Sequence, residues 1–485
     1  MSYTVAQNTS FLTSASILQK VISFAYFTLI ARFIGVENTG QYFFAIAFTT
    51  IFTVVADFGM GPVLTREAAK YPENSEKYLN TVFWTKIIFG LSAYLLVVFF
   101  VNILNYPPIT KDLIYLSGLT MFFDNLHSVF YSIFRARKNL IYESIGVIGS
   151  QFITLIIGTI ALLSHWPIIS LIAAYTIPAF LNFLYSAYFA RKVYKLKYSF
   201  AWNREIFKMF FYLAVPFALA GIIGRLYSYS DTLLISKFLD QKDMGLWSVP
   251  YKITFAFQFI PSALAASVYP AMSGFYLSDK AKVGELFEKS WRYLFLIVFP
   301  LSFGLFVLAK PVIIYLYGPN FALAAEVLKI LLMSLIFGFL SFITGSLLNA
   351  VGKQSRQTAL LGAALTVNII LNLILLPIFG IKGAAVSALA GNITLCLGGF
   401  YFTGREIIIN YGRLFKFLNQ YFWPALFMAA AVYFISSRFG FFLSIPAGMI
   451  IYCALVFVSG GVDKEIIKRV LQKVIKNSNV KKPIN

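Results

Sequence analysis

Long apolar stretches are the feature that most constrains what this chain can fold into. Runs of mostly apolar residues recur along nearly all of its 485 residues, and a helix needs about 20 such residues to cross the hydrocarbon core of a bilayer. Hydrophobic residues make up 59% of the chain and charged residues 12%, whereas a soluble chain has about 45–50% and 25%. The sequence therefore predicts an all-α polytopic membrane protein.

We count fourteen apolar stretches that are long enough to be transmembrane helices. They lie near residues 10–34, 40–65, 79–102, 112–134, 140–164, 167–190, 209–236, 245–274, 290–316, 322–350, 357–378, 381–404, 417–437 and 441–461. The first stretch is too long for the apolar core of a cleavable signal, so we expect it to be retained as a helix.

The positions of the basic residues predict how the spans are oriented. Of the 40 Lys and Arg residues, twenty-eight lie in connections on one side of the predicted membrane, seven on the other side and five inside spans. Short cytoplasmic connections are enriched in Lys and Arg, so both termini are predicted to be cytoplasmic, in a plasma or inner cell membrane. The net charge of +21 is thus explained by topology, and we expect no nucleic-acid partner.

The connections are too short to hold a folded domain, and the basic stretch 191–208 is the best candidate boundary. We interpret it as a solvated loop that contacts anionic headgroups, with an amphipathic surface helix as the alternative. The predicted organisation then has five parts. They are an N-terminal six-helix lobe (1–190), the connector (191–208), a second six-helix lobe (209–404), two further helices (405–461) and a basic cytoplasmic tail (462–485).

An internal repeat supports the two lobes. Residues 17–42 align without a gap with residues 222–247, and six positions are identical. Lys20 falls on Arg225 and Ser23 on Ser228 at this offset of 205 residues. Repeats of the same orientation are related by an axis along the membrane normal, and such transporters bind substrate between their halves near the midplane.

Charged residues inside the spans are the candidate site. Lys20 and Ser23 share a polar helix face in the first span, and Arg225 and Ser228 share one in the seventh. Because intramembrane ionisable groups usually face a bundle interior or a water-filled cavity, we predict that Lys20 and Arg225 line a central cavity that binds an anionic ligand. Lys252 extends this cationic wall or reaches to the membrane interface.

Acidic residues inside the spans have two competing interpretations. In the first, three acids face the cavity and could couple an ion to transport: Asp57, Asp124 and Asp231. Asp57 shares a predicted stripe with Gly61, and His127 follows Asp124 by one helical turn. The alternative is structural: Asp57 would form an ion pair with Lys20, and Asp124 would be a hydrogen-bonded structural carboxyl.

Two other charges, Lys86 and Glu143, lie near the predicted ends of their spans. We interpret both as reaching to the membrane interface.

Three segments resemble a known family. These are LIARFIGVENTGQYFFA (29–45), VVADFGMGPVLTREAAKY (54–71) and GSLLNAVGKQ (345–354). They are similar to the polysaccharide-exporting branch of the multidrug/oligosaccharidyl-lipid/polysaccharide exporter superfamily, which includes Wzx-type O-antigen flippases. The resemblance implies two six-helix lobes in a V shape and two extra helices, with a cationic cavity that takes the diphosphate and sugars of a polyprenyl-linked glycan. It also implies that Lys20 and Arg225 are the cavity cations. The related lipid II flippases have an acid directly after the first cation, whereas this chain has Val21.

Three functions compete to explain these features. A flippase for a lipid-linked oligosaccharide is favoured, because paired cations suit a diphosphate. A cation-coupled multidrug exporter would prefer an acidic cavity, and a glycan polymerase or ligase would need a larger extramembrane loop. Without a nucleotide motif, the energy would come from H⁺ or Na⁺ or from the glycan gradient. Membrane lipids and glycan assembly proteins are the expected partners, and we expect no cofactor, no metal and no enzymatic activity.

Overall fold

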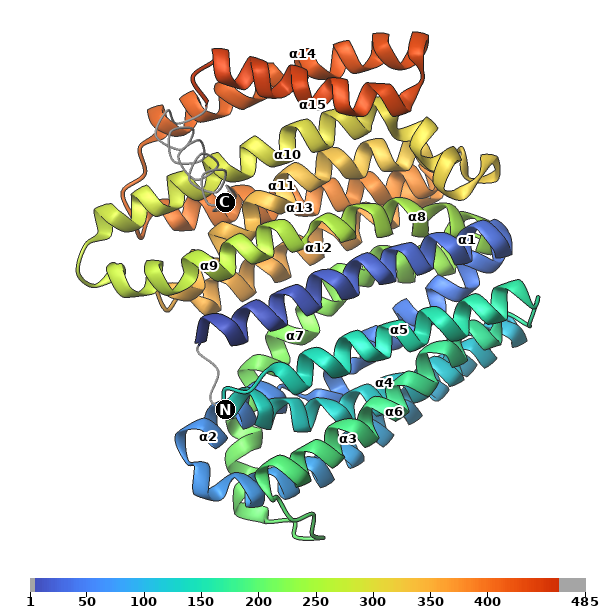
Figure 1. Ribbon diagram of the computed structural model, residues 1–485, viewed down its shortest axis with the longest axis vertical. Coiled ribbons are helices and arrows are strands. Elements are labelled where there is room, and N and C mark those ends of the chain that lie inside the picture. Colours follow the sequence, from blue (N-terminus) through green and yellow to red (C-terminus); the bar gives the residue numbers. More distant parts are fainter. Residues whose placement is uncertain (1–4, 462–485) are drawn as a thin grey trace, which may run out of the picture. The chain divides into compact units, whose positions relative to one another are not determined.

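The computed structural model describes residues 5–461, and these residues form helices and connections without a strand (Figure 1). The α-helices are α1 (Val5–Asp57), α2 (Met60–Lys70), α3 (Ser75–Ile103), α4 (Pro108–Ala136), α5 (Ile141–Leu163), α6 (Ile169–Tyr194), α7 (Arg204–Phe238), α8 (Gln241–Phe257), α9 (Phe259–Tyr276), α10 (Lys280–Tyr317), α11 (Ala324–Ala350), α12 (Gln354–Phe379), α13 (Ile381–Gly404), α14 (Tyr411–Phe439) and α15 (Phe441–Val458). Two short 3₁₀ turns are η1 (Pro72–Asn74) and η2 (Pro319–Phe321). The predicted tail 462–485 lies outside the described residues.

The prediction of an all-α membrane protein is confirmed. Within the described part of the chain, 12 helical segments are long and apolar enough to cross a membrane. One of them, Phe11–Lys70, contains two of the predicted spans. The α4 helix has 29 residues but is too polar to be among the 12. The count of fourteen therefore stays a prediction.

Backbone breaks divide the long helices, and one pair of breaks occurs at the same position of the repeat. Gly35 interrupts α1 with φ 76° and ψ 179°, a conformation open to glycine because it lacks a Cβ. Asp240, which separates α7 from α8, is the residue that aligns with Gly35 at the offset of 205. The Asp240 side chain accepts a hydrogen bond from the Asp243 N–H at 2.8 Å and so caps α8.

Two predicted spans prove to be interrupted. Phe58 and Gly59 adopt left-handed φ values of 46° and 72°, so the predicted helix 40–65 ends at Asp57 and α2 begins at Met60. The predicted stripe that joined Asp57 to Gly61 on one helix is therefore wrong. The predicted span 245–274 is likewise divided at Gln258, between α8 and α9.

The predicted connector is an extended segment that lies along α3. Residues 195–203 contain no helix, which excludes the predicted surface helix. Asn80 donates to the Lys197 carbonyl at 3.0 Å, and Trp84 Nε1 donates to the Ser199 carbonyl at 3.1 Å. The charged ends of Lys195 and Lys197 stay exposed, but the backbone is held in place and is not a free solvated loop.

The chain forms two compact units. The first comprises Met1–Phe259, Ile313–Val327 and Thr358–Thr394, and the second comprises Ile260–Val312, Leu328–Gln357 and Leu395–Asn485. In the second unit, α14 packs on α15, Arg413 pairs with Glu288 at 2.9 Å and Arg356 pairs with Glu406 at 2.7 Å. The predicted lobes 1–190 and 209–404 stay a prediction.

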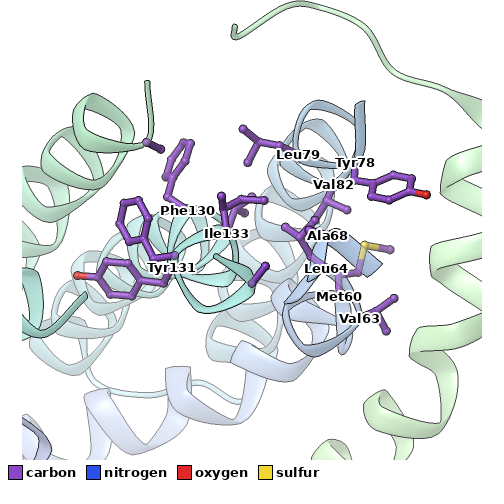
Figure 2. Packing of buried hydrophobic residues seen from close by; sticks show 14 of the residues in the cluster. Met60, Val63, Leu64, Ala68, Tyr78, Leu79, Val82, Phe130, Tyr131 and Ile133 are labelled. Atoms are coloured by element: carbon purple, nitrogen blue, oxygen red, sulfur yellow. The ribbon is translucent and has the colours of Figure 1, made fainter. Parts of the chain in front are cut away.

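The first unit contains the residues of the candidate site. Its helix α1 packs against α3, α4, α5, α7 and α8 (Figure 1). An apolar cluster joins α2, α3 and α4 through side chains such as Met60, Leu79 and Phe130 (Figure 2). Burial of side chains of this size contributes about 1.5–3 kcal/mol each in water, and in lipid the close packing between helices takes over that role. We call α1 to α6 the N-terminal bundle.

Candidate functional site

Lys252 on α8 lies between aromatic rings of α1. Its Nζ is 5.2 Å from the ring centre of Phe27 and 5.8 Å from that of Phe43. An ammonium group within about 6 Å of a ring centre is attracted by the electron-rich face of the ring. Lys252 is half-buried, and the aromatic faces hold its charge without neutralising it.

Lys20 on α1 is placed in the same way by a ring from α8. Its Nζ is 6.0 Å from the ring centre of Phe255, and the side chain is half-buried. Phe255 stacks on Tyr251 with ring centres 5.8 Å apart, and Tyr251 contacts Phe43 at 5.4 Å. We call Phe27, Phe43, Tyr251 and Phe255 the aromatic row. It connects the surroundings of Lys20 to those of Lys252.

Arg225 and Ser228 reach the aromatic row from α7. Both side chains are exposed, and the Tyr251 hydroxyl donates to the Ser228 carbonyl at 3.3 Å. Arg225 is also close enough to Tyr251 to interact with it electrostatically. The predicted cation of the second repeat thus lies near a ring of the aromatic row, Tyr251, as Lys20 and Lys252 lie near other rings of it. Ser23 differs from its counterpart Ser228, because it lies against Tyr175 of α6.

Among the residues that the structure describes, none of these cations has a carboxylate partner. Within residues 5–461 the ion pairs of the membrane helices involve other residues, such as Lys86 with Asp57 and Arg135 with Glu143. The predicted structural alternative, an ion pair between Lys20 and Asp57, is therefore wrong. Three cations with aromatic neighbours and no acid form a surface that can bind an anion.

Asp57 is paired with a lysine that sequence reasoning misinterpreted. Lys86 on α3 is 0% exposed and forms an ion pair with Asp57, which is 36% exposed. Lys86 Nζ also donates to Ser128 Oγ of α4 at 2.7 Å. The prediction that Lys86 reaches to the membrane interface is wrong, because its ammonium group is buried inside the N-terminal bundle and bound to Asp57 and Ser128.

Glu143 was misinterpreted in the same way. It is buried, and its carboxylate accepts hydrogen bonds from the Arg135 guanidinium. Its position eight residues after Arg135, across a short connection between helices, is the signal that could have indicated the pair.

Asp231 is buried against two asparagines of α12. Its Oδ1 accepts hydrogen bonds from Asn368 Nδ2 at 2.8 Å and from Asn372 Nδ2 at 2.6 Å. Ser230 Oγ donates to Asn368 Oδ1 at 2.8 Å and completes the group. Asp231 therefore does not share the exposed face of Arg225, in agreement with its different direction on the helix. Asn368 and Asn372 were missed because apolar residues surround them in the sequence.

Asp124 on α4 has no lysine, arginine or hydrogen-bond partner that would assign it a structural role among the described residues. Its side chain is 54% exposed, and His127 Nδ1 is 3.6 Å from Asp124 Oδ1. That distance is too long for a hydrogen bond. The structure thus keeps Asp124 and His127 close together, as their spacing predicts, and leaves the carboxylate without a cation among the described residues.

The two repeats meet through reciprocal contacts at one end of the first unit. An added Cβ at Gly40 would collide with the Gln241 carbonyl oxygen, and one at Gly245 would collide with the Val36 carbonyl oxygen. Gly245 aligns with Gly40 and Gln241 with Val36 at the offset of 205. Each repeat therefore presents the same glycine to the same backbone position of the other, as in a two-fold contact.

The cations at the ends of the first and seventh predicted spans add a second reciprocal contact. Arg32 Nη1 donates to the Tyr315 carbonyl at 2.8 Å, near the end of α10. Lys237 Nζ donates to the Leu104 carbonyl at 2.7 Å, directly after α3. Arg32 and Lys237 are aligned in the repeat, and each stabilises the carbonyl end of a helix that follows in the other repeat.

Comparison with known proteins identifies the family. The model of the family described as "Polysaccharide biosynthesis protein" matches residues 5–275. This chain belongs to the polysaccharide biosynthesis protein family. A second model, MatE, matches residues 216–374. The predicted resemblance to polysaccharide exporters is thereby confirmed.

Relatives of this family member have consistent names. The chain is 24% identical to "Probable low-salt glycan biosynthesis flippase Agl15" of Haloferax volcanii, over 95% of this chain and 97% of that protein. It is 25% identical to "Putative O-antigen transporter" of Shigella flexneri, over 74% of this chain and 88% of that protein. The solved structure "Lipid II flippase MurJ, inward closed conformation" matches with a TM-score of 0.76 and 19% identity, over 92% of this chain and 98% of that one. This last likeness shows the fold.

Proposed function

We propose that this polysaccharide biosynthesis family member is a flippase. It moves a polyprenyl-diphosphate-linked oligosaccharide from the cytoplasmic to the outer leaflet by alternating access. The observation that carries the proposal is the set of three cations, Lys20, Arg225 and Lys252, beside the aromatic row and without a carboxylate partner among residues 5–461. The names of the relatives, glycan flippase and O-antigen transporter, point the same way.

The chemistry of the site suits a diphosphate. A diphosphate carries about two negative charges, and charge-assisted hydrogen bonds to cations are roughly twice as strong as neutral ones. In a membrane protein these interactions gain further, because the surroundings screen charge less than water does. A carboxylate beside Lys20 or Arg225 would cancel this attraction. The polyprenyl tail would remain in the lipid, since it is apolar.

The topology proposed for this function has fourteen spans with both termini in the cytoplasm. Division of α1 at Gly35 and inclusion of α4 raise the 12 apolar helical segments to that number. The reciprocal contacts of Gly40 with Gln241 and of Gly245 with Val36 support two parallel six-helix repeats, with α14 and α15 outside them. Arg32 and Lys237, on the side poor in basic residues, then belong to an outer gate. The cell membrane is the proposed location.

Alternative functions fit the site less well. A cation-coupled multidrug exporter has some support from the MatE match, but its cationic substrates would be repelled by Lys20, Arg225 and Lys252. A polymerase or ligase would need a sizeable extramembrane loop to act on the glycan, and the predicted outer loops are short. We therefore infer transport without an enzymatic step, driven by H⁺, Na⁺ or the glycan gradient, with glycan assembly proteins as partners.

A reconstituted transport assay tests this proposal. Purified full-length protein in liposomes would be supplied with a fluorescent lipid-linked oligosaccharide in one leaflet, and an impermeant quencher would report its arrival in the other. Parallel liposomes would contain a fluorescent drug cation. We expect the lipid-linked glycan to change leaflet and the drug cation to stay. Movement of the drug cation alone would show that the exporter alternative is correct.

A further inference from the structure

A polar stripe runs along α4 through the N-terminal bundle. Side chains that recur every three or four residues share one face of a helix. The members of this stripe are Ser117, Thr120, Asp124, Ser128, Tyr131 and Arg135. The stripe explains why α4 is too polar to be among the apolar segments, although α4 packs against α1, α3 and α6 (Figure 1).

Five of the six stripe residues are bound to a polar group of a neighbouring helix. At one end of the stripe, Ser117 and Thr120 are hydrogen-bonded at 2.7 Å to Thr49 of α1 and to Thr176 of α6.

Ser128, Tyr131 and Arg135 are bound further along the helix. Ser128 accepts from Lys86 of α3, Tyr131 donates to Asn182 of α6, and Arg135 pairs with Glu143 of α5. Asp124 is the exception in the described structure, although it lies in the middle of the stripe and could be bound from either side.

The other two acids considered for ion coupling are already occupied. Asp57 is neutralised by the buried ammonium group of Lys86, and Asp231 accepts hydrogen bonds from two asparagines. Within residues 5–461, Asp124 has neither a cation nor an amide as a partner, and its side chain is 54% exposed. A carboxylate in a membrane bundle without a cation is costly and usually functional.

His127 gives Asp124 a proton partner. Its Nδ1 lies 3.6 Å from Asp124 Oδ1, and its side chain is only 14% exposed. The imidazole ring packs edge-on to Tyr131 at 4.8 Å between ring centres. A small rotation of either side chain would form a hydrogen bond between the carboxylate and the imidazole, so a proton bound to one group can be shared with the other.

We propose that Asp124 and His127 form a proton-binding site inside the N-terminal bundle, which couples a proton gradient to transport. This inference rests on the proposed function. The proton adds to Asp124 Oδ1 or to the imidazole nitrogen and leaves by the same atoms, so no bond other than the one to the proton forms or breaks. A metal cation such as Na⁺ would need several oxygen ligands, whereas the neighbour of the Asp124 carboxylate is the imidazole nitrogen of His127.

The charged groups around Asp124 and His127 are themselves neutralised by ion pairs, so they do not fix whether Asp124 and His127 carry a proton. Lys86 of α3 interacts with His127 electrostatically, but Asp57 of α1 neutralises it. Arg135 on α4 is neutralised by Glu143 of α5.

The remaining neighbours are uncharged. From α6, Asn182 and Tyr185 face Tyr131, and Thr176 is bound to Thr120. In the described part of this neighbourhood, Asp124 and His127 are therefore the carboxyl and imidazole groups that no ion pair with Lys86 or Arg135 occupies.

A pH gradient across liposomes provides the functional test. One coupled proton supports about a tenfold asymmetry of substrate between leaflets for each pH unit, because 1.4 kcal/mol corresponds to a factor of ten. We expect the wild-type protein to build this asymmetry with the fluorescent lipid-linked oligosaccharide. Asp124→Asn should equilibrate the same lipid without asymmetry, and Asp124→Glu should recover much of it. Asp112→Asn, which removes an exposed acid from the same helix, is the matched control and should behave as wild type.

Direct detection of the proton gives a readout that does not depend on transport. Infrared difference spectra of the purified protein between neutral and acidic pH should contain a protonated carboxyl band that is lost in Asp124→Asn and kept in Asp112→Asn. His127→Gln should shift the pH at which this band appears. Elution as a single peak in size-exclusion chromatography would show that each variant is folded.

The outcomes separate the inference from the function on which it rests. Glycan movement with a pH-driven asymmetry that survives in Asp124→Asn would overturn the proton site and leave the flippase intact. Glycan movement by the wild-type protein that does not depend on the pH gradient would also overturn the proton site and leave the flippase intact. A carboxyl band that depends on Asp124, in a protein that moves no lipid-linked glycan, would support the proton site and refute the flippase.

Discussion

Basic residues inside the membrane helices are stabilised in two different ways. In the N-terminal bundle, Lys86 and Arg135 are paired with Asp57 and Glu143. Beside the aromatic row, Lys20 and Lys252 lie over the faces of phenylalanine rings and have no acid within ion-pair distance among the described residues. Both arrangements lower the cost of a buried charge, but only the second leaves the charge available to a ligand.

This difference separates structural cations from functional ones. An ion pair satisfies the charge and ties two helices together, so removal of one partner leaves the other uncompensated. A cation–π contact is worth about 0.5–2 kcal/mol and leaves the positive charge in place. We infer that the paired cations maintain the fold and that the cations beside the aromatic row bind the substrate.

The largest expected effect is a loss of stability on removal of a paired cation. Lys86→Met leaves the Asp57 carboxylate unpaired, which costs about 3–5 kcal/mol in a buried pair. We expect the low end of that range, because Asp57 is 36% exposed. The melting temperature of the purified protein measures this loss. The double variant Lys86→Met with Asp57→Asn should recover most of it, and Lys77→Met at an exposed position of the same helix should have no effect. A Lys86→Met variant with the melting temperature of the wild-type protein would contradict the view that the paired cations maintain the fold.

Removal of a cation beside the aromatic row should affect transport and not stability. Lys20→Gln or Arg225→Gln should slow translocation of the lipid-linked oligosaccharide by about tenfold or more, since each lost charge-assisted hydrogen bond is worth about 1.5–3 kcal/mol. Lys20→Arg should retain part of the activity. The melting temperature should remain that of the wild-type protein. The exposed Lys242→Gln is the control, and an equal loss of transport in that variant would show that the effect is not specific to the site.

Introduction of an acid beside the site should convert a functional cation into a paired one. Ser228 lies three residues after Arg225 on an exposed helix face, and oppositely charged side chains at this spacing interact. Ser228→Asp should therefore reduce transport severalfold while the melting temperature stays unchanged. Ser228→Asn has nearly the same shape and should transport as wild type. Equal rates for the two variants would argue that Arg225 does not bind substrate through its charge.

The smallest expected effect concerns the ring that positions Lys20. Phe255→Leu keeps the position apolar but removes the cation–π contact, which is worth about 0.5–1 kcal/mol at a partly exposed site. We expect the apparent affinity for the lipid-linked oligosaccharide to fall by about twofold to fivefold, with little change in the maximal rate. Titration of substrate in the liposome assay gives both quantities. A change in the maximal rate alone would indicate that Phe255 acts on conformational change instead.

The helices could be predicted from the sequence because they depend on local composition. Apolar stretches of the right length indicated the spans, and Gly35 interrupts α1 within the gap predicted between the first two spans. The offset of 205 residues aligned Gly40 with Gly245, and the structure places these glycines in reciprocal contacts. Positions that recur at a fixed offset can be recognised in the sequence alone.

The partners of the charged residues were decided by the tertiary structure. Lys20, Lys86 and Arg225 are similar in sequence, since each interrupts an apolar helix. Only packing of α3 against α1 brings Lys86 to Asp57, and only packing of α1 against α8 places Lys20 over Phe255. The sequence determined that these residues lie in apolar spans. Which of them are paired and which stay available depends on contacts between distant helices, because an ion pair forms over a few ångströms whatever the separation along the chain.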